Sequence, residues 1–125
     1  DTPLSVTLGW FLAQRNGDTV ELRWQTAVET GTAGFHVLAV ADDGNKIRLN
    51  QGLIPSPVID SVTPTDYAFD AVTDATIFYL EELGVDGGVS EYGPFEMGQV
   101  YGARANDDGN AETMRPAIFL PIVSR

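Results

Sequence analysis

Short apolar runs alternate with turn-forming residues along most of this chain. The runs are rich in Val, Ile, Phe, Tyr and Thr, while Gly, Pro, Asn and Asp gather between them. This rhythm is typical of a β-sandwich, and no window of helical length carries an unbroken 3.6-residue apolar stripe. We therefore predict an all-β fold, a two-sheet antiparallel sandwich of about seven strands. The strands are expected near 6–14, 18–26, 33–41, 45–50, 66–71, 75–83 and 94–101.

The alternation of side chains indicates which faces are buried. In the second strand Val20, Leu22 and Trp24 point one way and charged or polar residues point the other, as in a half-buried antiparallel strand. In the first strand Gly9 tolerates a close neighbour or a bulge. That strand is expected to bury the face formed by Val6, Leu8, Trp10 and Leu12.

Two predicted strands, 33–41 and 75–83, are apolar on both faces. In a sandwich such strands are expected to be neighbours in one sheet. The outer surface of that sheet would then carry an apolar stripe that something should cover. The stripe consists of Leu38, Val40, Ile77 and Tyr79.

The chain changes character after Tyr101. The sandwich is assigned to residues 1–101, residues 102–116 read as a polar linker, and residues 117–125 form an apolar terminal strand. Pro121 cannot donate to a sheet ladder, so it favours an edge position. The strand either docks in cis on its own domain or in trans on a neighbouring subunit. Its expected contact residues are Ile118, Phe119, Leu120, Ile122 and Val123.

Charge and composition exclude several functional classes. Eighteen acidic and seven basic residues give a formal charge of −11, which disfavours binding to nucleic acid or to anionic membrane surfaces. No apolar stretch reaches the roughly 20 residues needed to cross a bilayer, so no membrane insertion is expected. The absence of cysteine removes thiol nucleophiles, thiolate metal sites and disulfides. Because the chain begins at Asp1, it is expected to be a mature, processed or excised segment from which any signal peptide is already gone.

Candidate chemistry is sparse. His36 is the one histidine and is expected to make a surface or interface contact, because no nucleophile and base converge with it. Glu81 and Glu82 are adjacent on a strand and must face opposite ways, so they form no carboxylate pair. We therefore predict no catalytic residue, no cofactor and no enzyme activity. Tyr92, near a Gly-rich loop, is the one candidate for an exposed carbohydrate platform.

Two acidic runs could attract calcium because hard cations prefer clustered oxygen ligands. Residues 42–45 read better as a tight hairpin, since Asp-Gly and Gly-Asn pairs are common turn formers. For residues 107–110 calcium stays an alternative.

Several segments of the chain follow one another as parts of a single sequence pattern. Residues 22–29 read Leu-Arg-Trp-Gln-Thr-Ala-Val-Glu, and residues 33–37 read Ala-Gly-Phe-His-Val. Residues 49–55, the run Tyr-Ala-Phe-Asp at 67–70, and the segment from 78 to 94 come next in order. Together these segments resemble fibronectin type III-like domains of bacterial secreted and surface proteins. The resemblance covers about residues 6–100 and implies an immunoglobulin-like sandwich in a secreted or cell-surface location.

The expected function is therefore a non-catalytic structural or interaction module of an extracellular assembly. Its partners are proteins, either further copies of the chain or a parent surface assembly. If the terminal strand docks in trans, head-to-tail contacts would build a filament. The alternative is an accessory module of a secreted enzyme that binds carbohydrate.

Overall fold

A computed structural model describes the backbone of residues 6–105, 111–113 and 121–123 and the side chains of residues 8–102. The described residues form strands and loops, with no helix among them. The strands are β1 (Val6–Asn16), β2 (Thr19–Glu29), β3 (Thr32–Val40), β4 (Lys46–Arg48), β5 (Ile54–Pro55), β6 (Thr65–Val72), β7 (Ile77–Gly84), β8 (Val89–Glu96), β9 (Val100–Ala105), β10 (Ala111–Thr113) and β11 (Pro121–Val123).

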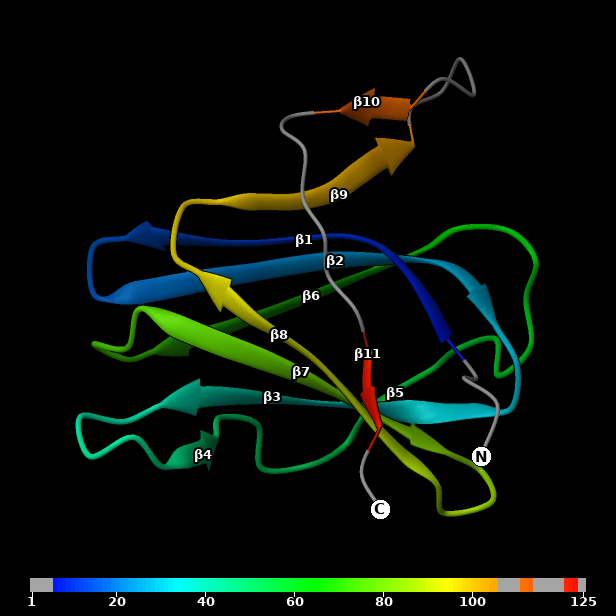
Figure 1. Cartoon of the computed structure of the whole chain (residues 1–125), viewed down its shortest axis with the longest axis horizontal. Coiled ribbons are helices and arrows are strands. Elements are labelled where there is room, and N and C mark those ends of the chain that lie inside the picture. Colours follow the sequence, from blue (N-terminus) through cyan, green and yellow to red (C-terminus); the bar gives the residue numbers. More distant parts are fainter. Residues whose placement is uncertain (1–5, 106–110, 114–120, 124–125) are drawn as a thin grey trace.

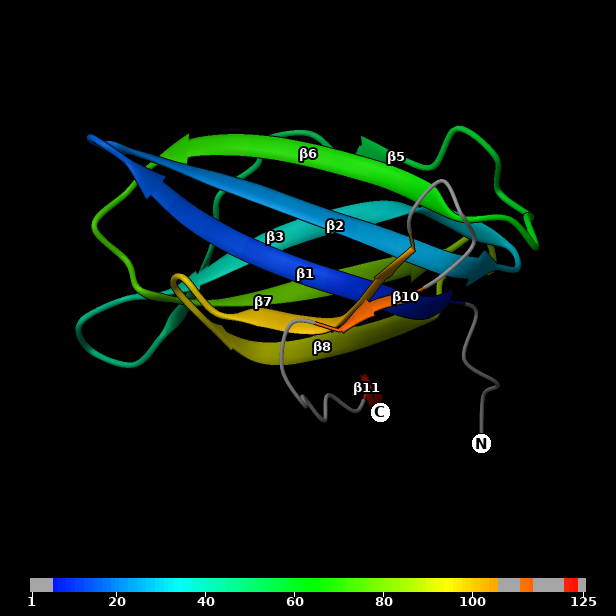
Figure 2. The ribbon, with the colours of Figure 1, turned by 90° about the horizontal axis from the view of Figure 1, so that it is seen from above.

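The strands form two antiparallel sheets that pack face to face (Figures 1 and 2). The first sheet has the order β10-β9-β1-β2-β6. The second has the order β11-β8-β7-β3-β4, with β5 paired to β3. The predicted all-β antiparallel sandwich is confirmed. The prediction that the two doubly apolar strands are neighbours is also confirmed, because β3 pairs with β7 over most of its length.

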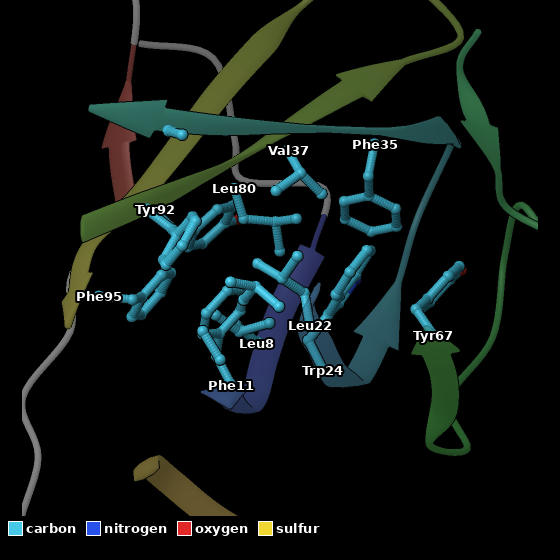
Figure 3. Close-up of a cluster of buried hydrophobic side chains, with 14 residues drawn as sticks. Leu8, Phe11, Leu22, Trp24, Phe35, Val37, Tyr67, Leu80, Tyr92 and Phe95 are labelled. Atoms are coloured by element: carbon cyan, nitrogen blue, oxygen red, sulfur yellow. The ribbon is translucent and has the colours of Figure 1, made fainter. Parts of the chain in front are cut away.

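The core lies between the two sheets and is dominated by aromatic rings (Figure 3). Val20, Leu22 and Trp24 of β2 are fully buried, as their alternation predicts. Trp24 stacks on Tyr67 with ring centroids 5.5 Å apart. Phe11 stacks on Phe95 of the opposite sheet at 4.1 Å. Such pairs add to the stability gained by burying large apolar surfaces, and the Phe11–Phe95 pair joins the two sheets.

A bulge at Gly9 changes the phase of β1. The register with β2 shifts on either side of this residue, and a Cβ on Gly9 would lie 3.1 Å from the carbonyl oxygen of Gln25. Leu8 therefore enters the core before the bulge, whereas Phe11 and Ala13 enter it afterwards. The bulge is confirmed, but the single buried face is wrong, because Trp10 and Leu12 turn to the other side of the sheet.

The C-terminal part of the sandwich differs from the prediction. The strand expected at 94–101 is two strands, since β8 ends at Glu96 and β9 begins at Val100 in the other sheet. A turn joins them, with Gly98 at a φ of 80° and its amide donating to the Ala13 carbonyl. β9 then pairs with β1. Residues 103–105 and 111–113, assigned to a linker from sequence, pair as an antiparallel hairpin.

Candidate functional site on the outer face of the second sheet

The predicted apolar stripe lies on the solvent side of the second sheet. Phe35, Val37 and Phe78 of β3 and β7 point into the core, so the residues between them point outward. We call the group of Leu38, Val40, Ile77 and Tyr79 the outer face. Leu38 and Tyr79 are direct cross-strand partners. Leu38 is only 9% exposed and the other three are half-buried, so this face is largely covered.

Part of the cover is an ion pair that crosses the sheet. Lys46 on β4 reaches over β3, and its Nζ lies 2.7 Å from Oε1 of Glu91 on β8. The same Nζ lies 4.0 Å from the centroid of the Tyr79 ring. A lysine stem laid along apolar surface shields it while the charged head stays at the solvent boundary. The ammonium over the ring adds a cation–π contact.

His36 lies beside the outer face but is not a surface residue. It is 7% exposed, and Nδ2 of Asn50 lies 2.9 Å from its Nδ1. Asn50 is itself fixed, because its Oδ1 accepts a hydrogen bond of 2.7 Å from the Val37 amide. Burial, and next the nearby Arg48, lower the pKa of His36 below its usual 6.5, against the opposing effect of Glu81. The exposed surface position expected for His36 is therefore wrong, and the interface contact stays a prediction.

Tyr92 is not an exposed platform. It is 1% exposed and its ring lies in the core beside Phe95 (Figure 3). The cause is the path of β8, which begins at Val89, continues through Gly93-Pro94 and directs Tyr92 inward, whereas the strand was expected to begin only at residue 94. Burial raises the pKa of the Tyr92 hydroxyl, and the carboxylate of Glu82 adds to the shift. The predicted carbohydrate platform is wrong, since Trp10 and Trp24 are buried as well.

The terminal strand meets the second sheet at its edge. The backbone of Pro121, Ile122 and Val123 pairs in antiparallel register with Tyr92, Glu91 and Ser90 of β8 in the same chain. Pro121 thus occupies the edge position that its missing amide favours. The side chains of Ile122 and Val123, and the whole of Ile118, Phe119 and Leu120, lie outside the described residues.

A buried carboxylate at one end of β2 was missed from sequence. Glu29 is 2% exposed, and its two oxygens accept hydrogen bonds from three hydroxyl groups. These come from Thr26 at 2.7 Å, Ser56 at 2.5 Å and Tyr67 at 2.5 Å. Burial and the bond to Glu29 raise the pKa of Tyr67. A carboxylate at the end of a strand gives no sequence signal that distant hydroxyl groups will converge on it.

The same network holds a surface loop. Ser56 Oγ, which donates to Glu29, also accepts the backbone amides of Val58 and Ile59 at 3.3 and 2.9 Å. Ile59 has a φ of 62°, a conformation that costs energy for a β-branched residue. Glu29 also pairs through its backbone with Ser61. The carboxylate therefore works as a structural anchor for residues 56–61.

The acidic residues form no metal centre in the described part of the chain. No group of three His, Asp or Glu side chains there could hold an ion. Residues 42–45 form the predicted hairpin, with Gly44 at a φ of 88° and Asp43 accepting the Asn45 amide. The calcium alternative at 107–110 falls on residues outside the described ones.

An open cleft of about 280 Å³ lies between the β3–β4 hairpin and the loop after β6. Its walls include Val40, Ile47 and Leu49, and Asp42 and Asp74 also line it. This volume is at the lower limit of small-molecule sites, and the exposed carboxylates point to no particular ligand.

Comparison of the chain with protein-family models, with curated proteins and with solved structures found no match. Among the described residues no helix is suited to cross a membrane.

Proposed function

We propose that this chain is a non-catalytic structural and interaction module of the fibronectin type III-like kind, and that it acts in an extracellular or bacterial cell-surface assembly. Copies are linked through the C-terminal strand, so that repeated head-to-tail contacts extend a filament. The observation that carries this proposal is the pairing of β11 with the edge of β8.

The order of the strands supports the family assignment. β1, β2 and β6 lie side by side in one sheet, and β4, β3, β7 and β8 lie side by side in the other. This division of consecutive strands between two facing sheets is the one that immunoglobulin-like sandwiches use. β9, β10 and β11 are additions outside that pattern, so any special property of this module is expected there.

The terminal pairing supports self-association because it is short and made at an edge. Backbone pairing of an extended segment with a sheet edge gives affinity without a preformed pocket. The three residue pairs form within one chain in this structure, and a neighbouring copy offers the same β8 edge to Pro121–Val123. Exchange of a terminal element between identical copies preserves native contacts and is a low-cost route to oligomers.

The non-catalytic assignment is supported by the structural roles of the residues that could do chemistry. Glu29 is saturated by three hydroxyl donors, and His36 is packed against Asn50. An active site would need a base and a nucleophile that reach a substrate together. Neither residue is placed for that task.

Disulfide trapping tests the proposal in a chain that has no cysteine of its own. One variant carries Glu91→Cys and a second carries Ile122→Cys, because these positions are direct register partners. The two variants are mixed at high concentration and oxidised. A disulfide-linked heterodimer in non-reducing electrophoresis is the expected result, since each chain lacks an internal partner.

The matched control replaces Glu91→Cys with Glu81→Cys, which lies one strand further from β11. Its Cα is then beyond the roughly 7 Å that a disulfide can bridge, so little heterodimer should form. Sedimentation of the full chain gives an independent measurement. A chain that stays monomeric at millimolar concentration and forms no heterodimer would refute assembly through the terminal strand.

A further inference from the structure

The two sheets have four edges, and one of them is unlike the others. β4, β10 and β11 each have 3 residues, and β11 begins with proline. β6, at the end of the first sheet, has 8 residues. Among the described residues only β2 pairs with it, in an unbroken register from Thr65 to Val72. Figure 2 shows β6 along the outer margin of its sheet.

This long edge lacks most of the features that protect sheet edges. Alternate residues of β6 direct their amide and carbonyl groups away from β2, which leaves a row of groups that no other described strand pairs with. Proteins usually protect such a row with proline, lysine, a bulge or a very short strand. The sequence Thr-Asp-Tyr-Ala-Phe-Asp-Ala-Val has neither proline nor lysine, and its register with β2 has no shift.

The exposed side of β6 carries two carboxylates four residues apart. Asp66, Ala68, Asp70 and Val72 alternate on this side and are exposed. Oδ1 of Asp66 accepts a hydrogen bond of 2.9 Å from Gln25, and Oδ1 of Asp70 accepts one of 2.6 Å from Arg23. Neither Oδ2 makes a hydrogen bond to a described residue. Asp66 therefore keeps capacity for a cation beside the neutral Gln25 amide, and Asp70 keeps capacity for a second cation beside Arg23.

The same carboxylates oppose pairing with a second copy of the chain. Two β6 edges that pair antiparallel about Ala68 would place Asp66 of each copy opposite Asp70 of the other. Like charges directly opposite on a sheet are destabilising, and the formal charge of −11 adds to the repulsion. The edge is therefore open to strand addition but discriminates against self-association.

We propose that the free edge of β6 binds an extended basic segment of a partner protein by strand addition. In antiparallel pairing the partner segment has an apolar residue opposite Val72. Two positions further along the partner, a lysine or arginine lies opposite Asp70. Four positions after that, a second lysine or arginine lies opposite Asp66. Main-chain hydrogen bonds supply affinity, and the two charge pairs set the register and select the partner. This site is separate from the β8 edge that takes the terminal strand.

A synthetic peptide tests the inference on the full chain. The probe is Ile-Thr-Lys-Val-Tyr-Val-Lys-Thr, which places its lysines opposite Asp70 and Asp66. Its binding is measured by calorimetry, and the site is located by amide chemical-shift changes in ¹⁵N-labelled protein. The expected result is saturable binding with the shifts centred on β6. The variant Asp66→Asn with Asp70→Asn should bind about ten-fold more weakly, because two cross-strand charge pairs are lost.

Matched controls separate strand addition from general charge attraction. The variant Glu81→Gln with Glu96→Gln makes the same charge change on the second sheet and should leave the affinity within about two-fold. The peptide Ile-Thr-Lys-Lys-Tyr-Val-Val-Thr has the same composition, but its adjacent lysines face opposite sides of a strand and should bind about ten-fold more weakly. The proposal would be overturned if both pairs of substitutions weakened binding equally, or if both peptides bound equally well. It would also be overturned by shifts centred on β8, by dimerisation through β6, or by the absence of saturable binding.

Discussion

Lys46 and Glu91 lie on strands separated by β3 and β7, yet their side chains meet 2.7 Å apart above the ring of Tyr79. The lysine side chain is 40% exposed, so solvent screens most of the charge–charge energy. Its main contribution is therefore expected from the aliphatic stem, which crosses the outer face from beside Val40 to the ring of Tyr79.

Replacing this lysine in two ways separates the stem from the charge. Lys46→Ala uncovers the outer face and should lower the free energy of unfolding by about 1 kcal/mol. Lys46→Met keeps a similar stem and should cost less than about 0.5 kcal/mol. Urea denaturation measures both. Equal losses in the two variants would mean that the charge, rather than the stem, stabilises the face.

The Glu29 network is where a nearly isosteric substitution is expected to lower the free energy of unfolding most. Glu29→Gln replaces one acceptor oxygen by an NH₂ group facing hydroxyl donors, and the stability should fall by about 2–4 kcal/mol. The exposed Glu96 on β8 is the matched control, and Glu96→Gln should change stability by less than about 0.5 kcal/mol. Limited proteolysis should also cut Glu29→Gln faster within 56–61, because Ser56 loses its anchor. A fully stable Glu29→Gln variant would contradict the anchoring role.

The sequence predicts those features that depend on local alternation. Val20, Leu22 and Trp24 point inward because side chains alternate along a regular strand, and no irregularity interrupts β2 there. The two-sided apolar character of β3 and β7 likewise identifies them as neighbours in one sheet. An alternation of period two is sufficient to predict which side chains are buried where the strand register is unbroken.

The failures fall at irregularities and at contacts between distant residues. The bulge at Gly9 reverses the faces of Trp10 and Leu12, and a bulge shifts every later residue by one position. Tyr92 is buried because β8 continues through Gly93-Pro94, which as a dipeptide is typical of a turn. The hydroxyl groups that bind Glu29 come partly from Ser56 and Tyr67, 27 and 38 positions away. No local pattern encodes such a convergence.

Two buried tyrosines predict loss of stability at alkaline pH. The pKa values of Tyr67 and Tyr92 are raised in the folded protein, chiefly by burial. Above about pH 10 the unfolded chain loses these phenolic protons while the folded chain keeps them, so stability falls as pH rises. Each tyrosine should contribute a slope of about 1.4 kcal/mol per pH unit. Denaturation between about pH 9 and 11 should show a shallower slope in Tyr67→Phe, and an unchanged slope would contradict the assignment.

The one histidine gives a direct test of the outer-face electrostatics by NMR. The titration midpoint of His36 should lie below 6.5, because burial and then Arg48 oppose its protonation. Arg48→Gln should raise the midpoint and Glu81→Gln should lower it further. Since the unfolded chain takes up the proton first, this residue should reduce stability as pH falls below about 6.5. Shifts of the opposite sign in these two variants would show that His36 has different neighbours in solution.

Gly34 marks the point where β5 approaches β3 too closely for any side chain. A Cβ on Gly34 would lie 2.8 Å from Cγ of Leu53 and still closer to the backbone carbonyl oxygen of Ile54. Gly34→Ala must therefore displace the β5 segment and should cost about 2 kcal/mol, as overpacking of a tight contact does. The matched change Gly52→Ala lies one residue before Leu53 and meets no atom within 4 Å, so it should be close to neutral. Urea denaturation of both variants, with amide exchange of Phe35 as a probe of the β3–β5 pairing, measures the difference. If Gly34→Ala were as stable as Gly52→Ala, β5 would not pack against β3 at this position in solution.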